Sequence, residues 1–206
     1  MRQPAATHLK CRQAVKGTYP PILDELGRGA PVGLVGIGGG CIANTAMATF
    51  ENRSRVFVKS VTGGHEKFES EMFEREAEGL RALAAARVIR VPEVLAVGEQ
   101  ALVLEMIQAA PKKHDFAEDF GRRFAALHHQ RGKSCGFAHD NFIGASRQYN
   151  DPLGGPWDAA ADDDGSTWPE FFLERRLRTQ VCLATSNGYG RELEHLLNRA
   201  EVLIIG

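Results

Sequence analysis

The chain has 206 residues, with 25 Lys and Arg against 26 Asp and Glu, and 43% of its residues are hydrophobic. This composition is typical of a globular protein of one or two domains and gives no indication of a nucleic-acid partner. Cys11, Cys41, Cys135 and Cys182 are widely spaced. The spacing indicates neither a disulfide framework nor a zinc site, so we expect a reducing, cytoplasmic setting. No run approaches the roughly 18 apolar residues of a membrane span.

The first half of the chain is predicted to contain five strands and one long helix. A short helix is expected near 21–29, followed by strands at 32–35, 42–50 and 55–59, a helix at 65–86, and strands at 91–97 and 101–107. The long helix carries apolar residues at spacings of three, four, seven and eight, namely Phe68, Met72, Phe73, Leu80 and Leu83.

The second half is predicted to be helical. A helix between 112 and 132 carries Phe116, Phe120, Phe124 and Leu127 on one stripe. Further helices are expected at 168–186 and 191–200, after a loop at 150–167 that is rich in Gly, Pro and Asp, and no strand is predicted in this half. We therefore expect two domains, at 1–107 and 108–206.

Four glycines fall within five positions at 36–40, and such clusters often let a backbone approach phosphate closely. A dinucleotide-binding loop would need a helix next and an acidic residue about twenty positions on, but a strand is predicted and residue 59 is Lys. A Walker A loop fails because Leu127 stands where Gly132-Lys133-Ser134 would need its first glycine. A kinase-type glycine turn between two strands remains, with an ordinary tight hairpin as the alternative.

Lys59 and Glu76 are predicted to form an ion pair. Lys59 lies on the third predicted strand, where a kinase lysine reaches the α- and β-phosphates. Glu76 lies on the apolar stripe of the long helix, between Phe73 and Leu80. A carboxylate there needs a cation opposite, because burying it unpaired costs several kcal/mol. The alternative is that Glu76 lies at the edge of the stripe and is half exposed.

Several segments together resemble the ketosamine/fructosamine kinase family, within the protein-kinase-like fold that includes aminoglycoside phosphotransferases. They are "GGGCI" at 38–42, "VFVK" at 56–59, "FEREAEGLRAL" at 73–83, "VIRVPEVL" at 88–95, "VLEMI" at 103–107, "FAALHH" at 124–129, "CGFAHDNFIG" at 135–144 and "TWPEFFLERRLRTQ" at 167–180. The resemblance implies an α+β fold, with a five-stranded antiparallel N-lobe containing one long helix, and an incomplete helical C-lobe.

The resemblance also implies ATP-dependent phosphorylation of the 3-hydroxyl of a ketosamine sugar on a small amine or a glycated protein, which leads to deglycation. Its implied ATP-binding residues are Gly38, Gly39, Gly40 and Cys41 over the phosphates, Lys59 with Glu76, and the backbone of Glu105, Met106 and Ile107 at the adenine. Asp140 and Asn141 are given a structural or sugar-side role. ATP with Mg²⁺ is the expected cofactor.

One departure from the family limits this expectation. The family's catalytic loop, His-Gly-Asp-Leu-Trp-Ser-Gly-Asn, and its metal-binding Asp-Pro-Ala segment have no counterpart here. His139-Asp140 does not replace them, since Ala145 stands where the kinase pattern has Asn. No catalytic residue or metal ligand is therefore assigned, and we expect a truncated, inactive kinase.

Truncation would leave helical apolar surface exposed, so self-association through that surface or through Cys41 is expected. Two other functions stay open. One is a kinase of aminoglycoside-like or choline-like alcohols, and the other is a non-catalytic nucleotide-binding remnant.

Overall fold

The computed structural model describes residues 19–38, 43–61, 71–130, 132, 134–151 and 167–205. The chain divides into two compact units. The first unit comprises Met1–Arg81 and Val91–Pro111, and the second comprises Ala82–Arg90 and Lys112–Gly206.

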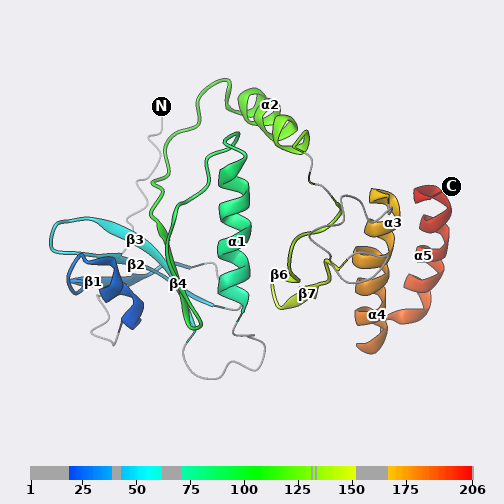
Figure 1. Cartoon of the computed structure of the whole chain (residues 1–206), viewed down its shortest axis with the longest axis horizontal. Coiled ribbons are helices and arrows are strands. Elements are labelled where there is room, and N and C mark those ends of the chain that lie inside the picture. Colours follow the sequence, from blue (N-terminus) through cyan, green and yellow to red (C-terminus); the bar gives the residue numbers. More distant parts are fainter. Residues whose placement is uncertain are drawn as a thin grey trace, which may run out of the picture. The chain divides into compact units, whose positions relative to one another are not determined.

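The first unit is built on a five-stranded antiparallel sheet (Figure 1). Its strands are β1 (Gly33–Gly36), β2 (Asn44–Thr49), β3 (Arg55–Ser60), β4 (Val94–Gly98) and β5 (Ala101–Glu105), in the spatial order β1-β2-β3-β5-β4. Helix α1 (Met72–Ala85) connects β3 to β4. The predicted order of strands and long helix is confirmed, although β5 ends at Glu105 and leaves Met106 and Ile107 outside the strand.

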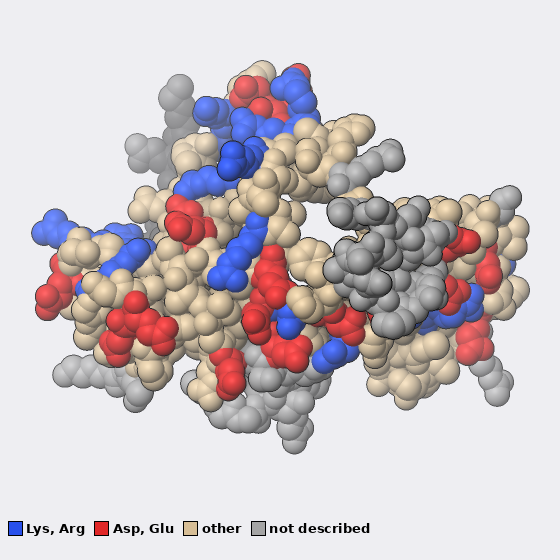
Figure 2. All heavy atoms as spheres, viewed as in Figure 1, with Lys and Arg blue, Asp and Glu red and all other residues tan. Residues whose placement is uncertain are grey.

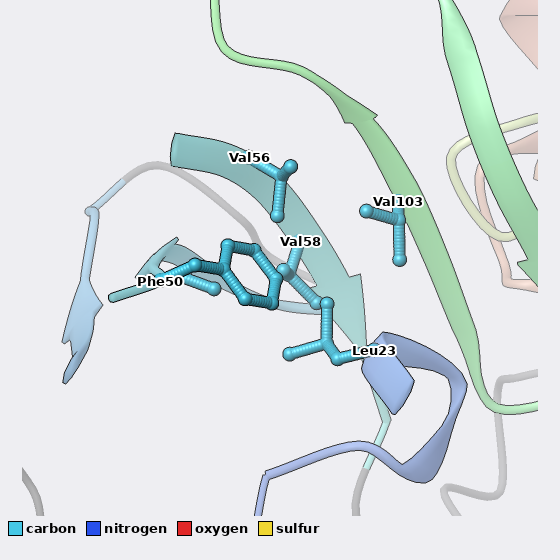
Figure 3. Packing of buried hydrophobic residues seen from close by; sticks show 6 residues of the cluster. Leu23, Phe50, Val56, Val58 and Val103 are labelled. Atoms are coloured by element: carbon cyan, nitrogen blue, oxygen red, sulfur yellow. The ribbon is translucent and has the colours of Figure 1, made fainter. Parts of the chain in front are cut away.

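One face of the sheet packs against the short 3₁₀ helix η1 (Pro21–Leu26). Leu23 of η1 is fully buried against Phe50, Val56, Val58 and Val103 (Figure 3). Burial of each such large apolar side chain contributes roughly 1.5–3 kcal/mol to folding. These contacts anchor η1 on the sheet.

The opposite face of the sheet packs against α1. Phe73 and Ala77, one helical turn apart, are buried against Leu102 and Leu104 of β5. Because side chains alternate along a strand, Leu102 and Leu104 point to the α1 face while Val103 points to the η1 face. All three are buried, as expected for a strand that is covered on both sides.

The second unit contains helices and one small hairpin. Its elements are α2 (Phe116–His128), β6 (Asn141–Ile143), β7 (Ser146–Gln148), α3 (Trp168–Phe172), the π-helical segment η2 (Leu173–Arg178), α4 (Thr179–Ser186) and α5 (Gly190–Ile204). The predicted helix at 168–186 is confirmed, since α3, η2 and α4 follow one another without a break. α4 packs against α5.

The hairpin of β6 and β7 corrects the prediction that the second half contains no strand. Each strand has only three residues, too few for an alternating pattern to be recognised. The available signal was Gly144, which lies in the turn with a φ of 62°. A left-handed conformation at that point favours glycine.

Asn150 connects the hairpin segment to η2. Its side chain is almost completely buried, its backbone N–H donates to Asp140 Oδ1 at 2.9 Å, and its Nδ2 donates to the carbonyl of His139 at 2.8 Å. Arg176 NH2 donates to Asn150 Oδ1 at 2.5 Å, and its guanidinium lies 4.9 Å from the centre of the Phe171 ring. Burial lowers the pKa of Arg176 from its usual value.

We expect Asn150→Ala to destabilise the second unit by about 2–3 kcal/mol, because Arg176 and the His139 carbonyl lose buried partners. Urea unfolding followed by tryptophan fluorescence measures this effect. Asn187→Ala is a suitable control, since the Asn187 side chain donates to Leu183 O in an exposed position. Equal costs for the two substitutions would contradict the role given to Asn150.

Acidic and basic side chains are interspersed on the face shown in Figure 2. Within the described residues, no helix is both long and apolar enough to cross a membrane.

Candidate functional site

A two-oxygen ion pair joins the sheet to α1. Lys59 Nζ donates to Glu76 Oε1 at 2.7 Å and to Glu76 Oε2 at 2.6 Å. The side chains are 26% and 36% exposed. The predicted pairing of Lys59 with Glu76 is confirmed, but both groups remain partly in contact with solvent. Such a pair contributes only about 0–1 kcal/mol to stability, so folding alone gives little reason for it.

Strand register and helix spacing together produce this pair. Lys59 lies opposite Leu102 of β5, and Leu102 belongs to the core on the α1 face. On α1, Phe73 and Ala77 are the residues buried against that core, and Glu76 lies between them in sequence. The helical period places Glu76 at the edge of the buried stripe, from where it reaches Lys59.

The glycine turn lies between β1 and β2. Ile37 N–H donates to the carbonyl of Thr45 at 2.8 Å, and the Thr45 hydroxyl donates back to the Ile37 carbonyl. Thr45 of β2 lies directly opposite Lys59 of β3, so the base of the turn is adjacent to the strand position that carries the lysine. Thr45 was not among the site residues predicted from the sequence, although its place in the predicted second strand was available. Because β2 follows the turn as a strand, a dinucleotide-binding or Walker A loop is excluded.

Gly36 and Gly38 leave open space beside the turn. A Cβ built on either would meet no atom within 4 Å, and neither has a positive φ. Neither packing against the described residues nor backbone conformation therefore requires glycine at these positions. Glycine here leaves the backbone open to a group from outside the chain. Gly39, Gly40 and Cys41 lie outside the described residues.

Glu105, Met106 and Ile107, the residues expected at the adenine, differ in which backbone groups are available for hydrogen bonds to a ligand. Glu105 is the last residue of β5, and its backbone N–H already donates to the carbonyl of Glu93 at 2.8 Å. Met106 and Ile107 follow the strand, and the Ile107 side chain is 39% exposed. A ligand at this edge would therefore be recognised by backbone groups of Met106 and Ile107 rather than by the N–H of Glu105.

A cavity of about 990 Å³ lies in the first unit, next to η1 and the base of the glycine turn. Its walls include Tyr19 and Ile22 from the η1 region, Leu34 of β1 and Ala46 of β2. Neither Lys59 nor Glu76 belongs to its described lining. The base of the glycine turn also lines it, through Gly36, Gly38 and Thr45, so the cavity extends to the open space beside that turn.

Asp140 has a structural role in the second unit. Its Oδ1 accepts the backbone N–H of Asn150 at 2.9 Å, and its Oδ2 lies 3.6 Å from Arg147 NH1. Asn141 is the first residue of β6. Among the residues that the structure describes, no three His, Cys, Asp or Glu side chains gather as a metal site would require.

A glycine turn between two strands, a lysine on the third strand and a helical glutamate paired with it define the N-lobe of a protein-kinase-like fold. The crystal structure of a protein from Thermobifida fusca YX-ER1, assigned as a fructosamine-3-kinase, superposes with a TM-score of 0.70. The match covers 86% of this chain and 59% of that one, at 24% identity.

The fructosamine kinase family model matches residues 27–204. The chain belongs to this family. A Synechocystis protein named "Probable ketoamine kinase" is 35% identical over 153 residues, which are 72% of this chain and 46% of that protein. The protein-ribulosamine 3-kinase, chloroplastic, of Arabidopsis thaliana is 34% identical over 155 residues, which are 72% of this chain and 42% of that protein. The chain thus spans less than half the length of these curated relatives.

Proposed function

We propose that the chain supplies the ATP-binding part of a phosphotransferase of the ketosamine/fructosamine 3-kinase type. The observation that carries the proposal is the Lys59–Glu76 pair, one strand from a glycine turn that leaves room for phosphate. Membership of the fructosamine kinase family supports it. We propose residues 1–107 as the nucleotide-binding domain and 108–206 as part of a C-lobe.

In this proposal Lys59 holds the α- and β-phosphates, and Glu76 keeps the ammonium in place. Backbone N–H groups at Gly38, Gly39, Gly40 and Cys41 would cover the phosphates, while Glu105, Met106 and Ile107 would line the adenine edge. Residues without a Cβ let a phosphate approach the backbone closely, which is why a glycine-rich sequence suits this position.

The proposed acceptor is the sugar of a ketosamine, on a small amine or on a glycated protein, phosphorylated at its 3-hydroxyl. The names of the ketoamine kinase and ribulosamine 3-kinase relatives support this class of acceptor. Mg²⁺ is the proposed metal, which would neutralise phosphate charge. The described residues do not offer a ligand set for it. For this chain we propose the ATP-binding step.

A second candidate is a nucleotide-binding protein without catalytic activity. Asp140 favours it, because its carboxylate is held by Asn150 and lies close to Arg147. A carboxylate engaged in this way is poorly placed to accept a proton from an acceptor hydroxyl. A kinase of aminoglycoside-like or choline-like alcohols remains the alternative within enzymes.

Calorimetry with ATP, combined with ³¹P NMR of reaction mixtures, tests the proposal. We expect the chain to bind ATP and Mg²⁺ and to release ADP at background rate. The Arabidopsis relative should phosphorylate ribulosyl-lysine or fructosyl-lysine under the same conditions, in preference to choline or kanamycin. Absence of ATP binding would contradict the assignment for this chain. A preference of the relative for choline or kanamycin would contradict the acceptor class.

We also propose a cytoplasmic setting, supported by the wide spacing of the four cysteines, which indicates no disulfide framework. Self-association through exposed apolar surface of the second unit is the last part of the proposal. It is supported by large side chains that are more than 40% exposed, among them Phe116, Leu183 and Leu203.

A further inference from the structure

An aromatic face runs along α2. Phe116, Phe120 and Phe124 recur every four residues, and their side chains are 45%, 45% and 46% exposed. Adjacent ring centres lie 6.0 and 5.8 Å apart, with interplanar angles of 14° and 16°. His128 continues the row, 4.5 Å from the Phe124 ring. No residue of α2 is buried. We call the row of Phe116, Phe120 and Phe124 the aromatic face.

Charged residues of α2 occupy two different sides of the helix. The helical period places Asp119 and Arg123 directly beside the aromatic face, where Arg123 Nε lies 2.9 Å from Asp119 Oδ2. Glu118 and Arg122 lie on the side away from that face, where Arg122 NH2 lies 2.7 Å from Glu118 Oε1. Only the first pair would lie next to a molecule that covers the aromatic face.

The sequence of this helix is arranged symmetrically about Phe120. From 116 to 124 it reads F-A-E-D-F-G-R-R-F, so phenylalanines stand at equal distances on both sides, with acids before the centre and bases after it. If a second copy of α2 lies antiparallel on the aromatic face, Phe120 meets Phe120 of the second copy and Phe116 meets Phe124. Along one flank, Asp119 then comes within reach of the second copy's Arg123.

Two further features suit an antiparallel pair. Ala117 and Gly121, on the other flank of the aromatic face, are small and allow the two helices to approach closely. Antiparallel helices also place the positive end of each dipole beside the negative end of the other. In a two-fold dimer the same surface of both copies forms the interface, and the aromatic face can pair in this way.

We propose that the aromatic face of α2 binds the same face of a second copy of this chain, antiparallel and about a two-fold axis through Phe120. This names the surface for the self-association proposed above, and it does not depend on nucleotide binding. The 13 residues of α2 span about 20 Å, which is small beside the interface of a stable dimer. We therefore expect a dimer that dissociates on the order of 100 μM.

Sedimentation equilibrium of the full chain, with two charge-reversed variants, tests this surface. Asp119→Arg makes the flank doubly basic and Arg123→Asp makes it doubly acidic. Each variant alone should associate at least about tenfold more weakly than the wild type, because like charges face each other across the axis. An equimolar mixture of the two variants should associate again, since a basic flank then meets an acidic one.

Glu118→Arg and Arg122→Asp are matched controls. Each breaks an i,i+4 pair within α2, as the test variants do, but on the side away from the aromatic face. They should leave the dissociation constant unchanged. Circular dichroism of all four variants verifies that the helix is retained, and Phe120→Ser provides a second, uncharged disruption that should also give monomers.

Three results would overturn the proposal. The first is a wild-type chain that stays monomeric up to several hundred micromolar. The second is equal weakening of association by Asp119→Arg and Glu118→Arg. The third is a mixture of Asp119→Arg and Arg123→Asp that stays monomeric. ATP binding by the same variants is measured separately, so a failure of nucleotide binding and a failure of this interface are told apart.

Discussion

Replacing Lys59 by alanine is expected to abolish the rise in melting temperature that ATP and Mg²⁺ produce in the wild-type chain. At about one hundred times its Kd, a ligand stabilises the folded state by about 2.7 kcal/mol. For a chain of this size, that corresponds to a rise in Tm of roughly 5–10 °C. Without the Lys59 ammonium the phosphates lose their main charged partner, so the rise should disappear. Differential scanning fluorimetry with and without ATP measures it.

The same substitution should change the unliganded protein little. The Lys59–Glu76 pair is partly exposed and contributes about 0–1 kcal/mol to stability. Glu76→Gln keeps one hydrogen-bond acceptor but removes the charge, so it should reduce the ATP-dependent rise without abolishing it. Arg55→Ala, at the exposed start of the same strand, is the matched control. An unchanged rise in the Lys59 variant would refute nucleotide binding at this lysine.

Gly136→Ala is expected to destabilise the second unit by about 3 kcal/mol. Gly136 has a φ of +93°, which an L-residue adopts only at a cost. A Cβ there would also lie 2.8 Å from the backbone oxygen of Asn150 and 2.9 Å from Cζ of the buried Phe171. Backbone strain and overpacking each cost about 1–3 kcal/mol. Because Trp157 and Trp168 both belong to the second unit, tryptophan fluorescence in urea reports its unfolding.

Gly188→Ala separates the two causes. Gly188 has nearly the same φ, +91°, but a Cβ there would meet nothing within 4 Å. Its substitution should therefore cost only the backbone strain, and the cost at Gly136 should exceed it by at least about 1 kcal/mol. Equal costs at the two glycines would show that Asn150 and Phe171 move aside without penalty.

Several features of the fold could be predicted from the sequence because they depend on short-range patterns. The alternation in β2 and β3 and the apolar stripe of α1 are properties of neighbouring residues, so they indicated strand and helix before any packing was known. The pairing of Lys59 with Glu76 followed from one physical requirement, a partner for a carboxylate on an apolar stripe. The exposed phenylalanines of α2 were also expected, and they are exposed.

Other features were decided by contacts between residues far apart in the chain. The β6–β7 hairpin depends on Asn150 and Arg176, which join segments 26 residues apart. The N–H of Glu105 is occupied because Glu93, the residue before β4, lies beside the end of β5, which the pattern of β5 does not reveal. The large cavity is lined by the η1 region, the base of the glycine turn and the turn between β4 and β5, which lie far apart in the chain.

The sequence by itself determined the sheet strands, the long helix, the glycine turn and the two charged partners, since each depends on spacing along the chain. Only the tertiary structure decided how deeply that ion pair is buried and which backbone groups at 105–107 can still bind a ligand. It also decided the role of Asp140. Burial and hydrogen-bond partners arise when distant segments pack together, and no local pattern in one sequence records them.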